Sequence, residues 1–207
     1  MSKTICLALT GASGMPYGIR LLECLLEHGC HVQLLYSKVA QVVARQEMAL
    51  ELPDQASEAR DFFRERFANL PGTLAVYGRE DWFAPVASGS NSPEAMVICP
   101  CTMGTLAAIA QGLSNNLIER AADVVLKERG KLILVPRETP LSDIHLENML
   151  RLSRAGAIIL PPNPGFYHHP QSVNDIVDFV VARLLDQLGI PHTLMQRWGD
   201  SADGERG

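Results

Sequence analysis

Short apolar runs of strand length alternate along this chain with longer segments of helical periodicity, and this alternation constrains the fold more than any other feature. Repeated β–α units of this kind build a parallel sheet with helices on both faces. We therefore predict an α/β fold, a Rossmann-like three-layer αβα sandwich with a mainly parallel sheet. Strands are expected at residues 4–9, 31–36, 73–76, 95–99, 131–135 and 157–160. Helices are expected at residues 15–27, 38–48, 56–68, 102–110, 116–128, 142–154 and 173–188.

The length and composition of the chain suit one compact domain. Its 207 residues are 47% apolar and 20% charged, which provides enough apolar side chain for a complete core. We expect a single domain over residues 1–198 and a disordered tail over residues 199–207. No apolar run reaches the roughly 18 residues that cross a membrane, and Gly11 interrupts the first strand-like run too soon for a signal peptide. The sequence therefore predicts a cytoplasmic protein without a membrane segment.

Charge, cysteine content and motif spacing exclude several classes of protein. A formal net charge of -5 argues against general nucleic-acid binding, which needs surplus positive charge. The five cysteines are odd in number, and four of them lie in apolar runs, so we expect reduced thiols and no disulfide framework. The chain has no Asp-rich cluster and no CxxC or HExxH spacing, so we expect no metal.

The turn after the first expected strand, residues 10–14 (TGASG), is the first candidate for ligand binding. Glycines let the backbone approach a phosphate, and the helix that follows offers free N–H groups and the positive end of its dipole. We predict that this turn holds the phosphate of a nucleotide. A tight turn in which Ser13 caps the helix is the alternative.

Two absences narrow the choice of nucleotide. TGASG also opens many NAD(P)-dependent short-chain reductases, but those need a Tyr and a Lys four positions apart, and no tyrosine here has such a lysine. The second expected strand is followed by Ser37 instead of the acidic residue that would hold an NAD ribose. A mononucleotide therefore fits the sequence better than NAD.

Three cations are candidates for a second anion site. Arg120 and Lys127 are seven residues apart in one expected helix, so two turns bring both to one face, and Arg137 follows the next strand. An ion pair between Lys127 and Asp123, four residues earlier, explains Lys127 equally well. Spacing alone leaves both interpretations open.

Several segments of the chain together form the pattern of one family. They are TGASG at 10–14, SKVA at 37–40, ASGS at 87–90, PCT at 100–102, ERAADVVLKER at 119–129, VPRETP at 135–140, and GFYH at 165–168 followed by PQS at 170–172. In this combination the chain resembles the UbiX-type flavin prenyltransferases over nearly its whole length, as far as Trp198. Thr102 stands where that family commonly has Ser, and the hydroxyl is retained.

The resemblance implies an activity and a set of partners. It implies a metal-independent transferase that moves a dimethylallyl group from dimethylallyl phosphate to reduced FMN, at N5 and then C6, to make prenylated FMN. It also implies a homo-oligomer, a dodecamer, with active sites between subunits. A UbiD-type decarboxylase would use the product, in ubiquinone biosynthesis or in aromatic acid decarboxylation.

The resemblance also implies roles for single residues. It assigns FMN binding to Gly11, Ala12, Ser13, Ser37, Thr102, Met103, Gly104, Thr105 and Arg137. It assigns the substrate, dimethylallyl phosphate, to Ser88, Ser90, Arg120, Lys127, Arg137, Tyr167, Arg183 and Trp198.

The expected catalytic residues form a third set under the same resemblance. Trp82 offers an aromatic face to an allylic cation, and Lys127 stabilises the departing phosphate. Glu138 accepts the proton lost from the flavin carbon, Glu47 assists, and Ser13 relays or stabilises a proton. Ordinary packing is the alternative for the two tryptophans, and an exposed helix position is the alternative for Glu47.

Two other functions compete with prenyl transfer. A flavin-dependent decarboxylase of cysteine-type substrates would share the fold, but those enzymes carry a catalytic His after the second strand and a Pro-x-Met-Asn motif, and this chain has neither. A non-enzymatic flavin carrier would leave Arg120, Lys127 and Glu138 without a role.

Overall fold

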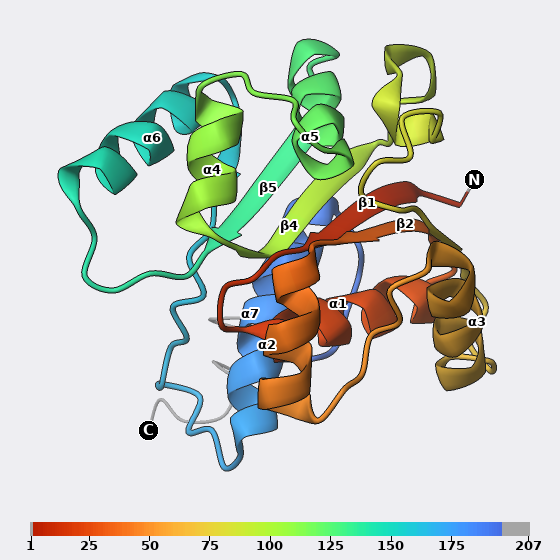
Figure 1. Cartoon of the computed structure of the whole chain (residues 1–207). Coiled ribbons are helices and arrows are strands. Elements are labelled where there is room, and N and C mark those ends of the chain that lie inside the picture. Colours follow the sequence, from red (N-terminus) through yellow and green to blue (C-terminus); the bar gives the residue numbers. More distant parts are fainter. Residues whose placement is uncertain (1, 196–207) are drawn as a thin grey trace. The chain divides into compact units, whose positions relative to one another are not determined.

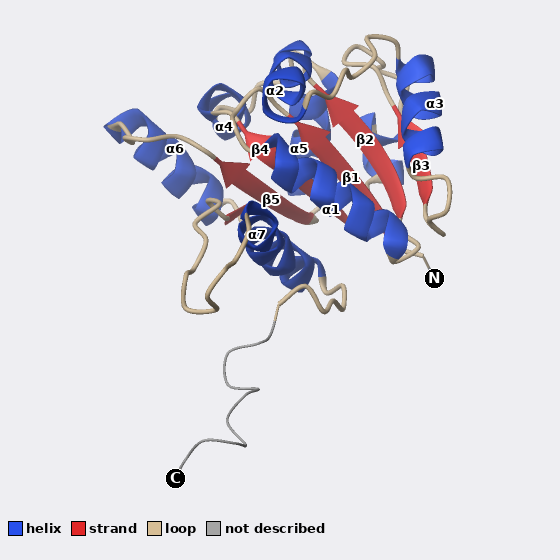
Figure 2. Ribbon diagram, turned by 90° about the horizontal axis from the view of Figure 1, so that it is seen from below, coloured by secondary structure: helices blue, strands red, loops and turns tan. Residues whose placement is uncertain are grey.

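The computed structural model describes residues 2–195, so the expected tail at 199–207 and Trp198 lie outside the described residues. The chain divides into two compact units, Met1–Pro162 and Asn163–Gly207. The first unit holds a six-stranded sheet in the order β3-β2-β1-β4-β5-β6, and every pair of neighbours is parallel. Figures 1 and 2 show the strands pointing the same way. The predicted α/β class with a parallel sheet is confirmed.

The strands follow the apolar runs of the sequence closely. Their bounds are β1 Thr4–Leu9, β2 His31–Tyr36, β3 Thr73–Val76, β4 Ala95–Cys101, β5 Lys131–Pro136 and β6 Ile158–Ile159. Strand β4 extends to Cys101, past the expected end at residue 99, because a register shift between Ile98 and Cys101 lets it pair again with the end of β5. The edge strand β6 is only two residues long.

The helices begin and end where capping groups allow. Their bounds are α1 Met15–Glu27, α2 Lys38–Met48, α3 Ala56–Arg66, α4 Met103–Ala110, α5 Leu117–Lys127, α6 Asp143–Arg154 and α7 Val173–Leu188. Helices α4 and α5 begin one residue later than expected because Thr102 and Asn116 are N-caps, whose side chains accept a hydrogen bond from the first turn. The expected long loop at 78–93 contains two 3-10 turns, Pro85–Ala87 and Gly89–Asn91.

Alternation of side chains along the strands builds the core on both faces of the sheet. On one face, Cys6 and Ala8 of β1 belong to a buried cluster with residues of α4 and α5, including Leu106 and Val125. Helix α1 packs against β1, β2 and β4. The central strands are therefore apolar on both faces, as parallel sheets require.

The five cysteines are all buried and free of disulfides, which agrees with the expected thiols. Burial raises the pKa of Cys6 and of Cys101 to about 12. A thiol with such a pKa is neutral near pH 7 and is a poor nucleophile.

The second unit contains α7, which is capped at both ends. Ser172 and Asp175 form a capping box at its start, and Gly189 ends it in a left-handed conformation with φ 63°. None of the helices within residues 2–195 is long and apolar enough to span a membrane.

Candidate functional site

The N-termini of α2 and α4 lie at the carboxyl ends of β2 and β4, the two strands that flank β1. Ser37, after β2, caps α2 by accepting a hydrogen bond from the Ala40 amide at 3.1 Å. Thr102, after β4, caps α4 by accepting from the Thr105 amide at 3.1 Å. The strand order reverses at β1, because β2 and β3 follow on one side of it and β4, β5 and β6 follow on the other. Ligands of open α/β sheets bind at such a switch point.

Both helix N-termini open into one cavity of about 280 Å³. We call it the flavin pocket after the ligand expected from the sequence; its lining residues are Thr10, Gly11, Ser37, Lys38, Val39, Arg79, Thr102, Gly104, Thr105, Asn116, Ile118 and Glu119. Helix N-termini attract anions through their unpaired N–H groups and dipoles. Gly104 leaves the first turn of α4 open, because a Cβ there would meet nothing nearer than the Thr102 hydroxyl at 4.0 Å. The pocket therefore fits a nucleotide phosphate.

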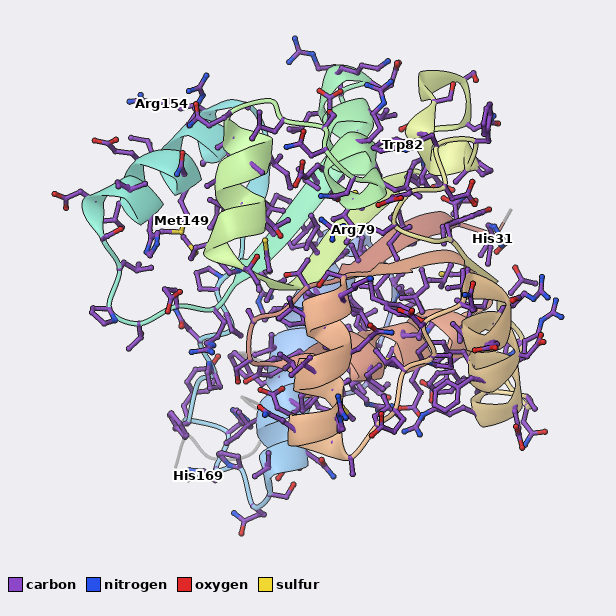
Figure 3. All side chains as sticks on the ribbon, viewed as in Figure 1. His31, Arg79, Trp82, Met149, Arg154 and His169 are labelled. Atoms are coloured by element: carbon purple, nitrogen blue, oxygen red, sulfur yellow. The ribbon has the colours of Figure 1, made fainter. Side chains whose placement is uncertain are left out.

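Two cations in this pocket strengthen that fit. Lys38 is the first residue of α2, and Arg79 lies on the loop after β3. Figure 3 labels Arg79 and Trp82 on that loop. Sequence analysis placed Lys38 in the family motif at residues 37–40 without assigning it to FMN, and it did not single out Arg79.

Thr10 joins the ends of β1 and β4 beneath the pocket. Its buried hydroxyl donates to the Pro100 carbonyl at 2.9 Å and accepts from the Thr102 amide at 2.8 Å. This pair of bonds fixes the N-cap of α4. Sequence analysis missed this role because Pro100 and Thr102 are 90 or more residues away.

Two backbone amides at the end of the turn at residues 10–14 have a partner within the chain. The Glu47 carboxylate, from the last turn of α2, accepts hydrogen bonds from the amides of Met15 at 2.8 Å and Gly14 at 3.0 Å. These are the amides that we expected to face a phosphate. The N-cap of α1 is Gly14 at φ 118° and no side chain caps the helix, so the alternative with Ser13 as the cap is wrong.

The rest of the turn packs closely against α2. A Cβ on Gly11 would lie 2.3 Å from Cγ1 of Val39, so only glycine fits there. Ala12 and Met103, both expected to bind FMN, are buried. Ser13 is half-buried in the turn. The amides of Gly14 and Met15 are therefore taken up by Glu47, whereas the N-termini of α2 and α4 border the pocket together with Gly11.

The basic residues of α5 form a second group, around the 3-10 turns. Arg120 donates to the Ala87 carbonyl at 3.1 Å and pairs with Asp123 at 2.9 Å. Lys127 pairs with Glu128, and both side chains lie against Gly89. The predicted alternative, a pair of Lys127 with Asp123, is therefore wrong.

Ser88 and Ser90 lie in the same turns as Gly89 and are exposed. Their hydroxyls are 2.9 Å apart. The structure thus brings these two serines, Arg120 and Lys127 to one side of a single chain.

Arg137 does not join this group within one chain. It follows the last residue of β5, whereas Lys127 ends α5, four residues before β5 begins. A six-residue strand spans about 20 Å, so the two side chains start from opposite ends of β5. Glu138 is exposed beside Arg137. The expected convergence of three cations is therefore absent from the single chain.

The remaining expected residues lie in the second unit or on the surface. In the second unit, the Tyr167 ring contacts Phe179 with centroids 6.0 Å apart. Arg183 pairs with Asp186 at 2.6 Å. Trp82 is 46% exposed on the loop after β3. Among residues 2–195, no group of three or more His, Cys, Asp or Glu side chains could hold a metal ion.

Comparisons with known proteins agree on one family. The family model described as Flavoprotein matches residues 1–185. The flavin prenyltransferase UbiX of Pseudomonas aeruginosa is 58% identical over 198 residues, which cover 96% of this chain and 95% of that protein.

Solved structures give the same result. AnUbiX (PadA1) in complex with FMN and dimethylallyl pyrophosphate is 40% identical with a TM-score of 0.85, covering 96% of this chain and 98% of that one. A dodecameric FMN-dependent UbiX-like decarboxylase from Escherichia coli O157:H7 is 43% identical with a TM-score of 0.81, covering 94% and 98%. The FMN-dependent cysteine decarboxylase TvaF, at 17% identity and a TM-score of 0.54, shares the fold alone.

Proposed function

This chain belongs to the UbiX-type flavin prenyltransferases, and we propose that it transfers the dimethylallyl group of dimethylallyl monophosphate to reduced FMN. The observation that carries this proposal is the flavin pocket, in which the N-termini of α2 and α4 meet beside Lys38 and Arg79. The product is prenylated FMN, bonded at N5 and then at C6. A cysteine-type decarboxylase has only the shared fold in its favour.

The first task of the chain is to hold the flavin phosphate. The first-turn amides of α2 and α4 donate to it, and Lys38 and Arg79 balance its charge. Thr10 keeps α4 in place by its bond to the Thr102 amide. Bound FMN supplies the nucleophilic nitrogen and carbon to which the prenyl group is joined.

The second task is to position groups around the flavin ring. We place the ring toward the turn at residues 10–14 and the end of β5. Ser13 lies in that turn, which Glu47 fastens to α2 through Gly14 and Met15. Glu138, exposed at the end of β5, accepts the proton that leaves the flavin carbon when the ring closes.

The third task is to stabilise the departing phosphate and the allylic cation. Arg120, Lys127 and the two serine hydroxyls of residues 88 and 90 form a polar group suited to a phosphate monoester. Fixed donors of this kind stabilise charge as it develops. Trp82 offers an exposed aromatic face to the cation. We assign Tyr167, Arg183 and Trp198 to the same substrate.

The separation of Lys127 and Arg137 supports an active site shared between subunits. Because they start from opposite ends of β5, one chain cannot place both on one phosphate. We propose that a second copy completes the site, within a homo-oligomer that is a dodecamer like the Escherichia coli relative.

The same proposal includes a cytoplasmic location. It also includes use of the product by a UbiD-type decarboxylase, in ubiquinone biosynthesis or aromatic acid decarboxylation.

Mass spectrometry of the extracted flavin tests the function. Purified protein given reduced FMN and dimethylallyl monophosphate, with a chelator present, should yield a flavin heavier by one dimethylallyl unit. Unmodified FMN in every condition would contradict the proposal. Lys127→Ala should retain FMN and lose the transfer; a variant with full transfer would remove Lys127 from the site.

Glu138→Gln tests the ring-closing step separately. It should stop at the N5 adduct, because the proton acceptor for ring closure is lost. Normal tetracyclic product from this variant would exclude Glu138 as the base.

A further inference from the structure

A larger cavity lies beside the flavin pocket, on the β3 side. Its volume is about 390 Å³, within the range of small-ligand sites. We call it the β3 cavity; its lining residues are Tyr36, Lys38, Gln41, Asp54, Ala56, Val76, Tyr77, Gly78, Arg79 and Glu80. The function proposed above gives this cavity no role.

The two cavities share two cations. Lys38 and Arg79 line both of them. Strands β2 and β3 contribute residues to the larger cavity. The function proposed above places the flavin phosphate at the N-termini of α2 and α4, which follow β2 and β4. With the flavin ring toward β5, as proposed above, the phosphate end of the flavin points toward the β3 cavity. A group attached to that phosphate would enter it.

The lining of the β3 cavity suits a nucleoside. Tyr36 and Tyr77 supply aromatic rings on which a base can stack. Tyr36 is held by a hydrogen bond to the Pro53 carbonyl, and burial raises its pKa to about 12, with added contributions from Asp54 and Glu58. Its ring is therefore a fixed, neutral surface near pH 7.

Two carboxylates lie on the same lining. Asp54 and Glu80 are exposed and can accept hydrogen bonds from ribose hydroxyls. Dinucleotide-binding sheets use an acidic residue in this way. The residue after β2 is Ser37, but the segment between α2 and α3 brings Asp54 to the same end of the sheet. The carboxylates would repel a ligand with several phosphates at this position.

We propose that the β3 cavity binds the adenosine part of FAD, so that this protein binds the flavin dinucleotide as well as FMN. The proposal rests on the placement of the flavin phosphate in the function proposed above. The second phosphate of the dinucleotide would lie between Lys38 and Arg79, and the adenosine beyond them.

Equilibrium titration of the flavin-free protein with FMN and with FAD tests this proposal. FAD should bind with a dissociation constant within about tenfold of that of FMN. Ala56→Trp fills the β3 cavity without touching the flavin pocket, so it should weaken FAD at least about tenfold and leave FMN unchanged. Ala68→Trp, on an exposed position outside both cavities, is the matched control and should change neither.

Asp54→Asn gives a second readout that preserves side-chain volume. It should weaken FAD about threefold or more without affecting FMN, because only the adenosine part meets this carboxylate. It also decides the question if the tryptophan variant does not fold.

The contrary outcomes are distinct. The proposal is overturned if the protein binds FMN but not FAD. It is also overturned if neither Ala56→Trp nor Asp54→Asn changes FAD affinity, because the adenosine would then lie in solvent. Equal weakening of FMN and FAD by Ala56→Trp overturns it as well, since the two cavities would not be separate sites. Failure to bind either flavin refutes the proposed function itself and with it this inference.

Discussion

The Glu47 carboxylate accepts a hydrogen bond of 2.8 Å from the backbone amide of Met15, and so joins the last turn of α2 to the first turn of α1. The two residues are 32 positions apart in the sequence. An anion at a helix N-terminus is stabilised by the free N–H groups and by the helix dipole. Here the protein supplies that anion from its own chain.

Replacing this carboxylate should loosen the turn that carries Ser13. We expect Glu47→Ala to destabilise the protein by about 1 kcal/mol, the usual effect of losing a helix cap, and to weaken FMN binding. Urea unfolding and flavin titration measure the two effects. Glu51→Ala removes an exposed carboxylate paired with Arg45 at 3.6 Å and should change neither; an equal effect of both variants would argue against the capping role.

The hydroxyl of Thr10 should be essential for stability and flavin binding, whereas its methyl group should not be. Thr10→Val keeps the volume but leaves the Thr102 amide without its partner, at a cost of about 1–3 kcal/mol. FMN affinity should fall as well, since α4 loses its fixed start. Thr10→Ser retains the hydroxyl and should rescue most of both losses. Normal flavin binding in the valine variant would show that α4 is positioned by other contacts.

A shared active site predicts complementation between two inactive variants. Lys127→Ala and Arg137→Ala should each abolish prenyl transfer when assayed alone. If Lys127 and Arg137 of one site come from different copies, subunits mixed after dissociation should recover about a quarter of the unaltered activity, the random fraction of intact sites. Recovery should be absent if one chain supplies both residues, which the assay of mixed oligomers distinguishes directly.

Asp175 should contribute to stability in a defined pH range. Hydrogen bonds from the Gln171 amide and from the side chain and amide of Ser172 hold the pKa of this carboxyl below its ordinary value near 3.8. A lowered folded-state pKa stabilises the fold above the unfolded pKa, and the contribution disappears as the pH falls through the folded pKa.

Thermal unfolding of the unaltered protein and Asp175→Asn, from about pH 6 to about pH 3, checks this expectation. The difference between the two proteins should be constant at the upper end and shrink below the ordinary pKa. Other carboxylates cancel in the difference. A difference that grows on acidification would reverse the sign and refute the assignment.

Much of the fold was predictable because it depends on local periodicity. Residues 4–9 and 31–36 are apolar over a strand length and lie in β1 and β2 with unchanged bounds. The bounds of α7 were also predicted correctly. Its capping residues, Ser172 at the start and Gly189 at the end, directly flank the helix in the sequence. Such signals involve neighbours along the chain.

The sequence by itself determined the α/β class, the parallel sheet and, through whole-chain similarity, the family. The tertiary structure alone decided which amides are free, because Glu47 reaches Gly14 and Met15 only when α1 and α2 pack together. It also decided that Lys127 and Arg137 leave β5 at opposite ends. The spacing of residues along one helix shows which of them share a face of that helix. It does not show at which end of the sheet they lie. Distant pairings of this kind depend on how helices cross a sheet, which no local pattern in the sequence encodes.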